Sequence, residues 1–264
     1  MAELLRDIEP LRPLLARRPL AILSDIDGTL APIVPDPAHA RVSERAREAL
    51  QRLIARGVHV GLITGRDLET ARRMTGLPEA WYAANHGITL SIAGAEETPQ
   101  AVRAFISLAR EVIRETAGLE RAGVTVEDKG PVVAFHYRRA PSPEGAAEAI
   151  RAAIVRSPAA SGFAIHEGRM VIELRPPLDL NKGTALDELV RRMDAAAVIC
   201  LGDDATDVDM FRRVRAMRDA GTPAATIAVE SAEASDEVLA NADFYVGGVE
   251  GVESLLEDVL RALP

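Results

Sequence analysis

The chain has 264 residues, of which 48% are hydrophobic and 27% charged, and its formal net charge is −9. This length allows one large domain or two smaller ones, no apolar run is long enough to span a bilayer, and the acidic balance excludes a general nucleic-acid binder, because phosphate backbones require a basic face. The first residues, MAELLRD, lack the basic-then-apolar order of a secretory signal, so we expect a cytoplasmic protein.

The first part of the chain alternates predicted strands with predicted helices. Residues 20–24 and 58–63 are short apolar runs typical of buried strands, and residues 43–56 between them have helical periodicity. A helix over about 67–74 and a strand over 81–84 follow. This alternation indicates a doubly wound parallel sheet, in which ligands bind beyond the carboxyl ends of the strands.

The pattern changes at about residue 99. A helix over 101–116 precedes a hairpin over 124–137, and a helix over 143–155 precedes a second hairpin over 163–174. This order predicts an antiparallel sheet with two helices on one face, which is a separate α+β domain.

The alternating pattern then returns, with helices and strands predicted at 183–193, 197–201, 207–213, 226–229 and from 251 onward. An insertion explains this return. We therefore expect a Rossmann-like, doubly wound α/β core made of residues 1–98 and 178–264, and an inserted α+β cap domain at residues 99–177.

Two carboxylates follow the first predicted strand, in the motif Asp25-Ile-Asp27-Gly28-Thr-Leu. A carboxylate can attack phosphorus and form an aspartyl-phosphate, and a neighbouring carboxyl can protonate the leaving oxygen and later activate water. The alternative is an Asx-turn that caps the strand end. The position after a buried strand favours the catalytic interpretation, with Asp25 as nucleophile and Asp27 as general acid/base.

Two further loops offer groups that suit a phosphate. Thr64-Gly65-Arg66 places a hydroxyl and backbone N–H groups at a helix start, although Thr64 is also consistent with an ordinary N-cap. Asn181-Lys182-Gly183 opens another helix with one of the two lysines of the chain. A lysine there could neutralise charge on a transferring phosphoryl group, and the alternative is a solvated surface lysine.

Three carboxylates crowd another strand end in Gly202-Asp203-Asp204-Ala-Thr-Asp207. Their mutual repulsion is costly unless they share a cation, and hard oxygen ligands suit Mg²⁺. A helix N-cap in this loop is the simpler alternative and is compatible with a metal. We expect Asp203 to bind the metal together with Asp25 and the backbone carbonyl of Asp27.

Taken together, the motifs resemble those of the haloacid dehalogenase-like phosphatase superfamily and, more narrowly, the trehalose-6-phosphate phosphatase family. The resemblance covers nearly the whole chain, in the segments 25–33, 64–66, 85–87, 127–129, 136–138, 168–176, 181–183 and 202–207. The core motifs mark the superfamily, and the cap motifs narrow the match. Val208 stands where the family usually has an acidic residue. Thr64 stands where the family often has a serine, and threonine keeps the hydroxyl group.

The resemblance implies a role for each matching residue. The implied catalytic residues are Asp25, Asp27, Thr64 and Lys182, the metal ligands Asp25, Asp27 and Asp203, and the residues next to the metal ligands Asp204 and Asp207. The implied substrate-binding residues are Arg66, His86, Glu127, Lys129, Arg138 and Glu173. The last four would grip sugar hydroxyls, for which a solvated sheet face is the alternative. His39, His59 and His166 are expected to be structural or solvated.

The resemblance further implies a Mg²⁺-dependent phosphoric monoester hydrolase that converts trehalose 6-phosphate to trehalose and phosphate in trehalose biosynthesis. Another sugar phosphate is the near alternative: sucrose 6-phosphate, mannosyl-3-phosphoglycerate or glucosylglycerol phosphate. A non-catalytic sugar-phosphate sensor and a phosphotransfer mutase also stay open. The expected partner is a small sugar phosphate, with no nucleic acid and no membrane, and we expect a monomer.

Overall fold

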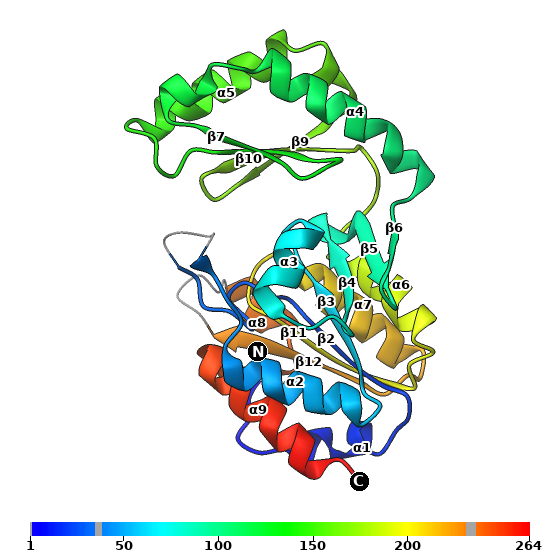
Figure 1. The fold of residues 1–264 in the computed structure, drawn as a ribbon. Helices are drawn as coiled ribbons and strands as arrows, with labels where there is room; N and C mark the ends of the chain where they lie inside the picture. The colour runs from blue at the N-terminus through cyan, green and yellow to red at the C-terminus, as the bar shows by residue number, and fades with distance from the viewer. Residues whose placement is uncertain (1, 35–38, 231–235) are drawn as a thin grey trace. The chain divides into compact units, whose positions relative to one another are not determined.

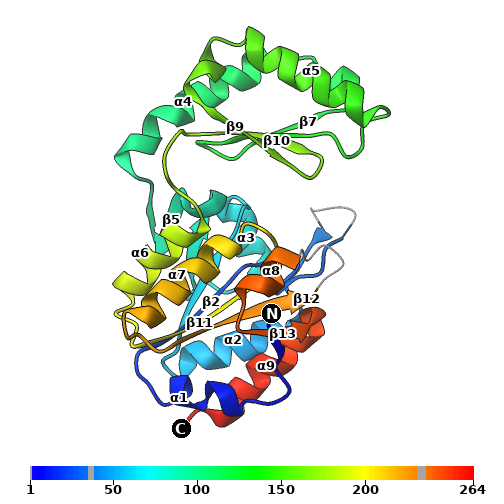
Figure 2. The same ribbon diagram turned by 180° about the vertical axis from the view of Figure 1, so that it is seen from behind.

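The computed structural model describes residues 2–34, 39–230 and 236–264. The chain folds into two compact units, a core unit of Met1–Glu97 and Leu180–Pro264 and a cap unit of Thr98–Asp179 (Figures 1 and 2). Among the described residues, none of the helices combines the length and the apolar character needed to cross a membrane.

The core unit is built on a nine-stranded sheet. Its strands lie in the order β1 (Glu3–Leu4), β13 (Phe244–Gly247), β12 (Ala224–Glu230), β11 (Ala197–Gly202), β2 (Leu20–Ser24), β3 (His59–Ile63), β4 (Trp81–Ala84), β5 (Thr89–Ile92) and β6 (Ala95–Glu97). Neighbouring strands from β1 to β4 are parallel, which confirms the predicted doubly wound sheet. The antiparallel strands β5 and β6 extend one edge and are not predicted by the sequence analysis.

Helices cover both faces of this sheet. One face packs against α1 (Arg12–Leu15), α2 (Glu44–Ala55), α3 (Leu68–Thr75) and α9 (Gly248–Ala262), and the other against α6 (Lys182–Arg192), α7 (Val208–Asp219) and α8 (Asp236–Asn241). Alternate side chains of β2 enter the two layers, since Leu20 and Ile22 join the first and Ala21 and Leu23 the second. Every residue of β2 is therefore buried, and the strand end is fixed at the centre of the sheet.

Helix α7 runs six residues beyond its predicted end. The prediction stops at Arg213, where charged residues become frequent, but Val214 continues the buried apolar stripe of Val208 and Phe211. One apolar residue at helical spacing thus keeps the helix packed on the sheet. Short 3₁₀ turns lie at Glu9–Leu11 (η1), Asn85–Gly87 (η3), Leu119–Ala122 (η4) and Ala159–Gly162 (η5).

The cap unit is a four-stranded antiparallel sheet in the order β7 (Thr125–Asp128), β8 (Val133–His136), β10 (Val171–Arg175) and β9 (Ala164–Gly168). Helices α4 (Gln100–Glu115) and α5 (Pro143–Arg156) lie over one face, as predicted (Figure 1). Phe135, Ile172 and Leu174 point into the layer between sheet and helices and are fully buried. Along each strand the alternate residues point to the opposite face of the sheet, and this face is polar.

Candidate active site

Asp25 lies at the carboxyl end of the central strand β2. Its backbone N–H donates to the carbonyl of Leu201 at 3.1 Å, so the residue is tied to the neighbouring strand β11. The residue is only 3% exposed, and its Oδ1 accepts a hydrogen bond from Nζ of Lys182 at 2.8 Å. The residue expected to act as nucleophile is thus held in one orientation by a cation.

Lys182 begins helix α6 and is buried. A capping box fixes this helix start, because the Asn181 side chain accepts from the Thr184 N–H at 2.9 Å and the Thr184 hydroxyl accepts from the Asn181 N–H at 3.0 Å. The ammonium donates to Asp25 and, at 2.7 Å, to Oδ1 of Asp207. Burial opposes its charge, but Asp207 and Asp25 outweigh burial and raise the pKa of Lys182 well above its ordinary value. The alternative of a solvated surface lysine is wrong.

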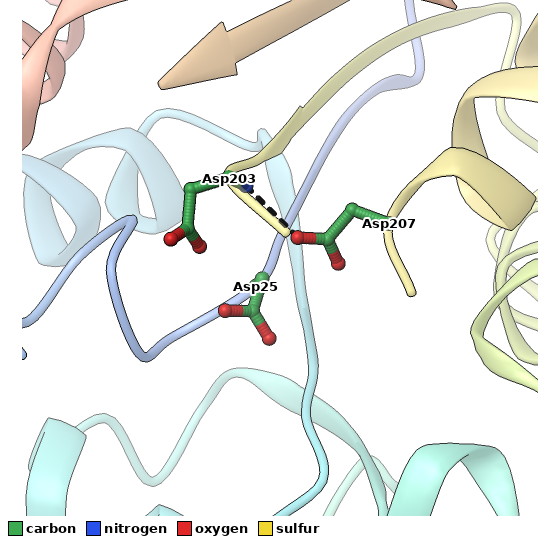
Figure 3. Close-up of side chains that lie close together, drawn as sticks. All are labelled: Asp25, Asp203 and Asp207. Atoms are coloured by element: carbon green, nitrogen blue, oxygen red, sulfur yellow. Dashed lines mark hydrogen bonds between the residues drawn. The ribbon is translucent and has the colours of Figure 1, made fainter. Parts of the chain in front are cut away.

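The acidic loop after β11 is organised around Asp207. One oxygen of this fully buried carboxylate accepts the N–H of Asp203 at 2.9 Å (Figure 3). The same oxygen accepts the N–H of Asp204 at 3.1 Å, and the other oxygen accepts from Lys182. Asp203 is 2% exposed, and its Oδ1 accepts the hydroxyl of Thr29 at 3.2 Å. Asp207 therefore shapes the loop, and its place next to the metal ligands stays a prediction.

The cluster carries more negative than positive charge. Carboxylate oxygens of Asp25, Asp203 and Asp207 all lie within 4.8 Å of one another, and Asp204 adds a fourth acid near Lys182. Burial is the main cause that raises the pKa of Asp25, Asp203 and Asp207, and repulsion from the other carboxylates adds to it. A set of crowded carboxylate oxygens is the donor set that a hard divalent cation prefers. The residues present therefore fit a metal ion.

This excess charge predicts that the metal-free protein loses stability as the pH rises from about 4 to about 7. Burial, Asp207 and Asp204 raise the pKa of Asp203 from its ordinary 3.8 to about 7, so the folded chain keeps a proton that the unfolded chain has lost. Asp25 and Asp207 shift in the same direction and Asp204 in the opposite one. We expect Mg²⁺ to raise the melting temperature more at pH 8 than at pH 5, which calorimetry measures. An equal shift at both values would contradict this charge balance.

Gly28 permits the close approach of Asp203 to the loop after β2. Its φ is +82°, and a Cβ on this residue would lie 2.0 Å from Oδ2 of Asp203. We expect Gly28→Ala to lower the free energy of unfolding by about 1–3 kcal/mol beyond backbone strain alone, because Asp203 must move. Gly94 is the matched control, since it has the same φ of +82° and open space around the Cβ position. In urea titrations Gly94→Ala should show only the strain, about 1–2 kcal/mol, and an equal cost at both positions would contradict the expected clash.

Asp27, expected to be the general acid/base, is bound by Arg66. Nε of Arg66 donates to Oδ2 of Asp27 at 2.9 Å and Nη2 donates to Oδ1 at 2.6 Å. Arg66 is in turn fixed by its own N–H, which donates to the hydroxyl of Thr64 at 3.1 Å. The loop after β3 thus reaches the loop after β2, whereas the family resemblance implies that Arg66 contacts substrate. The sequence offers no local signal for this pair, because the two residues lie on different loops.

His86 is held beside the same loop by its backbone. Its N–H donates to the carbonyl of Thr64 at 2.8 Å, and its φ of 57° places it in the left-handed region. A Cβ on Gly65 would lie 2.6 Å from Nε2 of His86, so the ring packs directly against Gly65. Burial opposes ionisation of Asp204, but Lys182, the hydrogen bonds from Thr206 and, last, charge on His86 outweigh burial and lower the pKa of this carboxyl.

Three of the four expected sugar contacts, Glu127, Lys129 and Glu173, lie close together in the cap unit. Lys129 donates to Oε1 of Glu173 at 2.9 Å and lies 4.0 Å from Glu127, whose Oε2 is 2.7 Å from Nε2 of His136. Glu173 is 5% exposed, so it is not part of a solvated sheet face. Arg138 lies two residues after β8 and is exposed.

Two residues outside the predicted set lie on the polar face of the cap sheet. Arg175 donates two hydrogen bonds to Oε2 of Glu173, one from Nε at 2.9 Å and one from Nη2. His166 lies directly opposite Glu173 in the register of β9 and β10, and partial burial and then Arg175 lower the pKa of its imidazole. The period of two from Glu173 to Arg175 is a signal that the sequence offers for Arg175, whereas His166 requires the register between two strands.

Known proteins resemble this chain over most of its length. The trehalose-phosphatase family model matches residues 23–245. The chain is 37% identical over 225 residues to the trehalose-phosphate phosphatase of Mycobacterium leprae (80% of this chain, 51% of the relative) and 39% identical over 217 residues to that of Mycobacterium avium (79% and 55%). It therefore spans about half the length of these curated relatives.

A solved structure shares the fold. The C-terminal domain of C. albicans trehalose-6-phosphate phosphatase aligns with a TM-score of 0.73 and 23% identity, covering 99% of this chain and 98% of that one. The family match covers the core loops that hold Asp25, Lys182 and the acidic cluster, and also the whole cap sheet. The chain belongs to the trehalose-phosphatase family.

Proposed function

We propose that this chain hydrolyses trehalose 6-phosphate to trehalose and inorganic phosphate. The observation that carries the proposal is the Asp25 carboxylate, oriented at 2.8 Å by a buried lysine at the carboxyl end of the central strand, in a chain of the trehalose-phosphatase family. The curated relatives bear the name trehalose-phosphate phosphatase, and the reaction is carried over to this chain from them.

The first half of the proposed reaction transfers the phosphoryl group to Asp25. An oxygen of the Asp25 carboxylate forms a bond to phosphorus while the bond from phosphorus to the sugar oxygen breaks. Asp27 gives its proton to that leaving oxygen, which releases trehalose. Because Arg66 engages both oxygens of Asp27 in the observed geometry, Arg66 has to release one of them for this step.

The second half hydrolyses the aspartyl-phosphate. Asp27, now unprotonated, takes a proton from a water molecule, whose oxygen forms the new bond to phosphorus as the bond to Asp25 breaks. Lys182 neutralises charge on the phosphoryl oxygens in both halves, and the Thr64 hydroxyl donates to one of them. A bound Mg²⁺, held by Asp25, Asp203 and the Asp27 carbonyl, would add further neutralisation of that charge.

The cap unit supplies the sugar contacts in this proposal. Glu127, Lys129, Arg138 and Glu173 offer carboxylate acceptors and cationic donors, which are suitable partners for vicinal hydroxyl groups. We further propose that the metal ion is Mg²⁺, that the protein is a cytoplasmic monomer and that it has no role with nucleic acid. Sedimentation equilibrium tests the monomeric state directly.

A substrate panel tests the proposal. The purified chain with Mg²⁺ is given equal concentrations of trehalose 6-phosphate, sucrose 6-phosphate, mannosyl-3-phosphoglycerate, glucosylglycerol phosphate and glucose 6-phosphate, and phosphate release is measured. We expect kcat/KM for trehalose 6-phosphate to exceed that for glucose 6-phosphate by roughly 100-fold, because the cap hydrogen bonds require the second sugar. Equal rates would contradict disaccharide selection, and binding without release would indicate a sensor.

A further inference from the structure

The polar face of the cap sheet is arranged in rows across the strands. Register places Ala134 of β8 opposite both Glu127 of β7 and Glu173 of β10, and His166 of β9 opposite Glu173. Arg175 follows Glu173 by two residues on β10, so both side chains stand on this face. Glu173 thus occupies the middle of the face, with small Ala134 beside it.

Glu173 is held from two sides. Lys129 binds Oε1 at 2.9 Å, and Nε and Nη2 of Arg175 both bind Oε2, with Nε at 2.9 Å. The side chains of Lys129, Glu173 and Arg175 are 8%, 7% and 19% exposed, so the three charges are largely removed from water. With both oxygens tethered, the plane of the carboxylate cannot turn.

Stability alone does not account for this trio of charges. Removing charged groups from water costs free energy that their attraction often fails to recover, and apolar side chains of similar volume are usually as stabilising. The other face of the same strand shows that alternative, since Ile172 and Leu174 are fully buried there against the helices. An immobilised and largely buried acceptor on the polar face of the sheet is better explained by recognition.

We propose that Arg175 is a positioning residue for sugar recognition: it acts through Glu173, whose carboxylate it aims at a hydroxyl group of the substrate. This inference rests on the proposed function and adds a residue to it. Lys129 cannot replace Arg175, because it binds Oε1, and without Arg175 the Oε2 atom loses both guanidinium donors that fix it. Loss of Arg175 should therefore weaken binding of the sugar and leave the transfer of the phosphoryl group unchanged.

A double-mutant cycle tests this coupling. Kinetic constants are measured for the unaltered chain, Arg175→Gln, Glu173→Gln and the double variant, with trehalose 6-phosphate and with 4-nitrophenyl phosphate, which has no sugar. We expect Arg175→Gln to lower kcat/KM for the sugar ester roughly 10- to 100-fold, mainly through KM, since hydrogen bonds to charged groups are worth that much. The aryl ester should change less than about twofold, and Arg175→Lys should recover part of the loss.

The cycle separates positioning from independent binding. In the Glu173→Gln background, the change at Arg175 should cost less than about twofold, because nothing remains to be positioned. Arg151→Gln is the matched control: Arg151 also pairs with a glutamate of this sheet, Glu167, through two bonds of 2.9 Å, but belongs to helix α5. It should leave both substrates within about twofold, as expected for an exposed ion pair.

Additive losses at Arg175 and Glu173 would overturn the inference, as would equal losses on both esters or no loss at all. Failure of the proposed function looks different, because the unaltered chain would then prefer another sugar phosphate of the panel. The cycle is in that case run on the preferred ester with the same expectations. An unaltered chain that hydrolyses no sugar phosphate leaves Glu173 no sugar to recognise and overturns both proposals.

Discussion

Asp25→Asn is expected to lower kcat for phosphate release by roughly 10,000-fold or more, the scale on which removal of a nucleophile usually acts. The amide keeps the shape of the carboxylate but cannot form the aspartyl-phosphate. Its fold should survive, because the change removes one of four crowded carboxylates whose burial and repulsion raise the pKa of Asp25. Lys182 keeps Asp207 as a hydrogen-bond partner at 2.7 Å.

Phosphate release and thermal unfolding are measured on the same preparations. Asp219→Asn serves as the control, since it removes an exposed carboxylate at the end of α7 and should leave kcat within about twofold, as for a surface change. The metal-free Asp25→Asn protein should melt no lower than the unaltered chain. Retention of more than about a hundredth of the activity would refute Asp25 as the nucleophile, given the scale of such losses.

Lys182→Met is expected to cause the largest loss of stability. The methionine fills a similar volume, but Asp25 and Asp207 lose the cation that both of them contact. Removing one partner of a buried ion pair typically costs about 3–5 kcal/mol, because the remaining charge is buried without compensation. The deficit should shrink toward pH 5, because this lies below the pKa of about 7 to which burial raises Asp203, and protonation there removes part of the uncompensated charge. Burial raises the pKa of Asp25 and Asp207 in the same direction.

Urea titrations at pH 5 and pH 8 measure this deficit. Arg213→Met is the control, because Arg213 pairs with Asp187 at 3.3 Å with side chains 48% and 41% exposed. A surface pair of this kind contributes less than about 1 kcal/mol. Turnover by Lys182→Met should also fall, since the phosphoryl charge is no longer neutralised. A deficit that is the same at both pH values would show that the carboxylates do not depend on the lysine.

Local patterns in the sequence predict most elements of both units. Alternation of strands and helices indicates the doubly wound core, and the helix–hairpin order indicates the cap sheet, because these signals depend only on neighbouring residues. Strands β5 (Thr89–Ile92) and β6 (Ala95–Glu97) escape prediction, since polar residues in them break the continuous apolar run that marks the buried strands. Their pairing is decided by the sheet edge to which they add.

The sequence by itself determined which residue types stand at the strand ends, and it therefore predicted that the expected nucleophile, the expected phosphate-binding cation and the acidic cluster belong to one sheet edge. Only the tertiary structure decided their partners. Lys182 and Asp25 are 157 residues apart, Arg66 and Asp27 belong to different loops, and Lys129 and Arg175 meet at Glu173 through strand register. Such contacts depend on how distant segments pack, a three-dimensional property that local periodicity and short motifs do not encode.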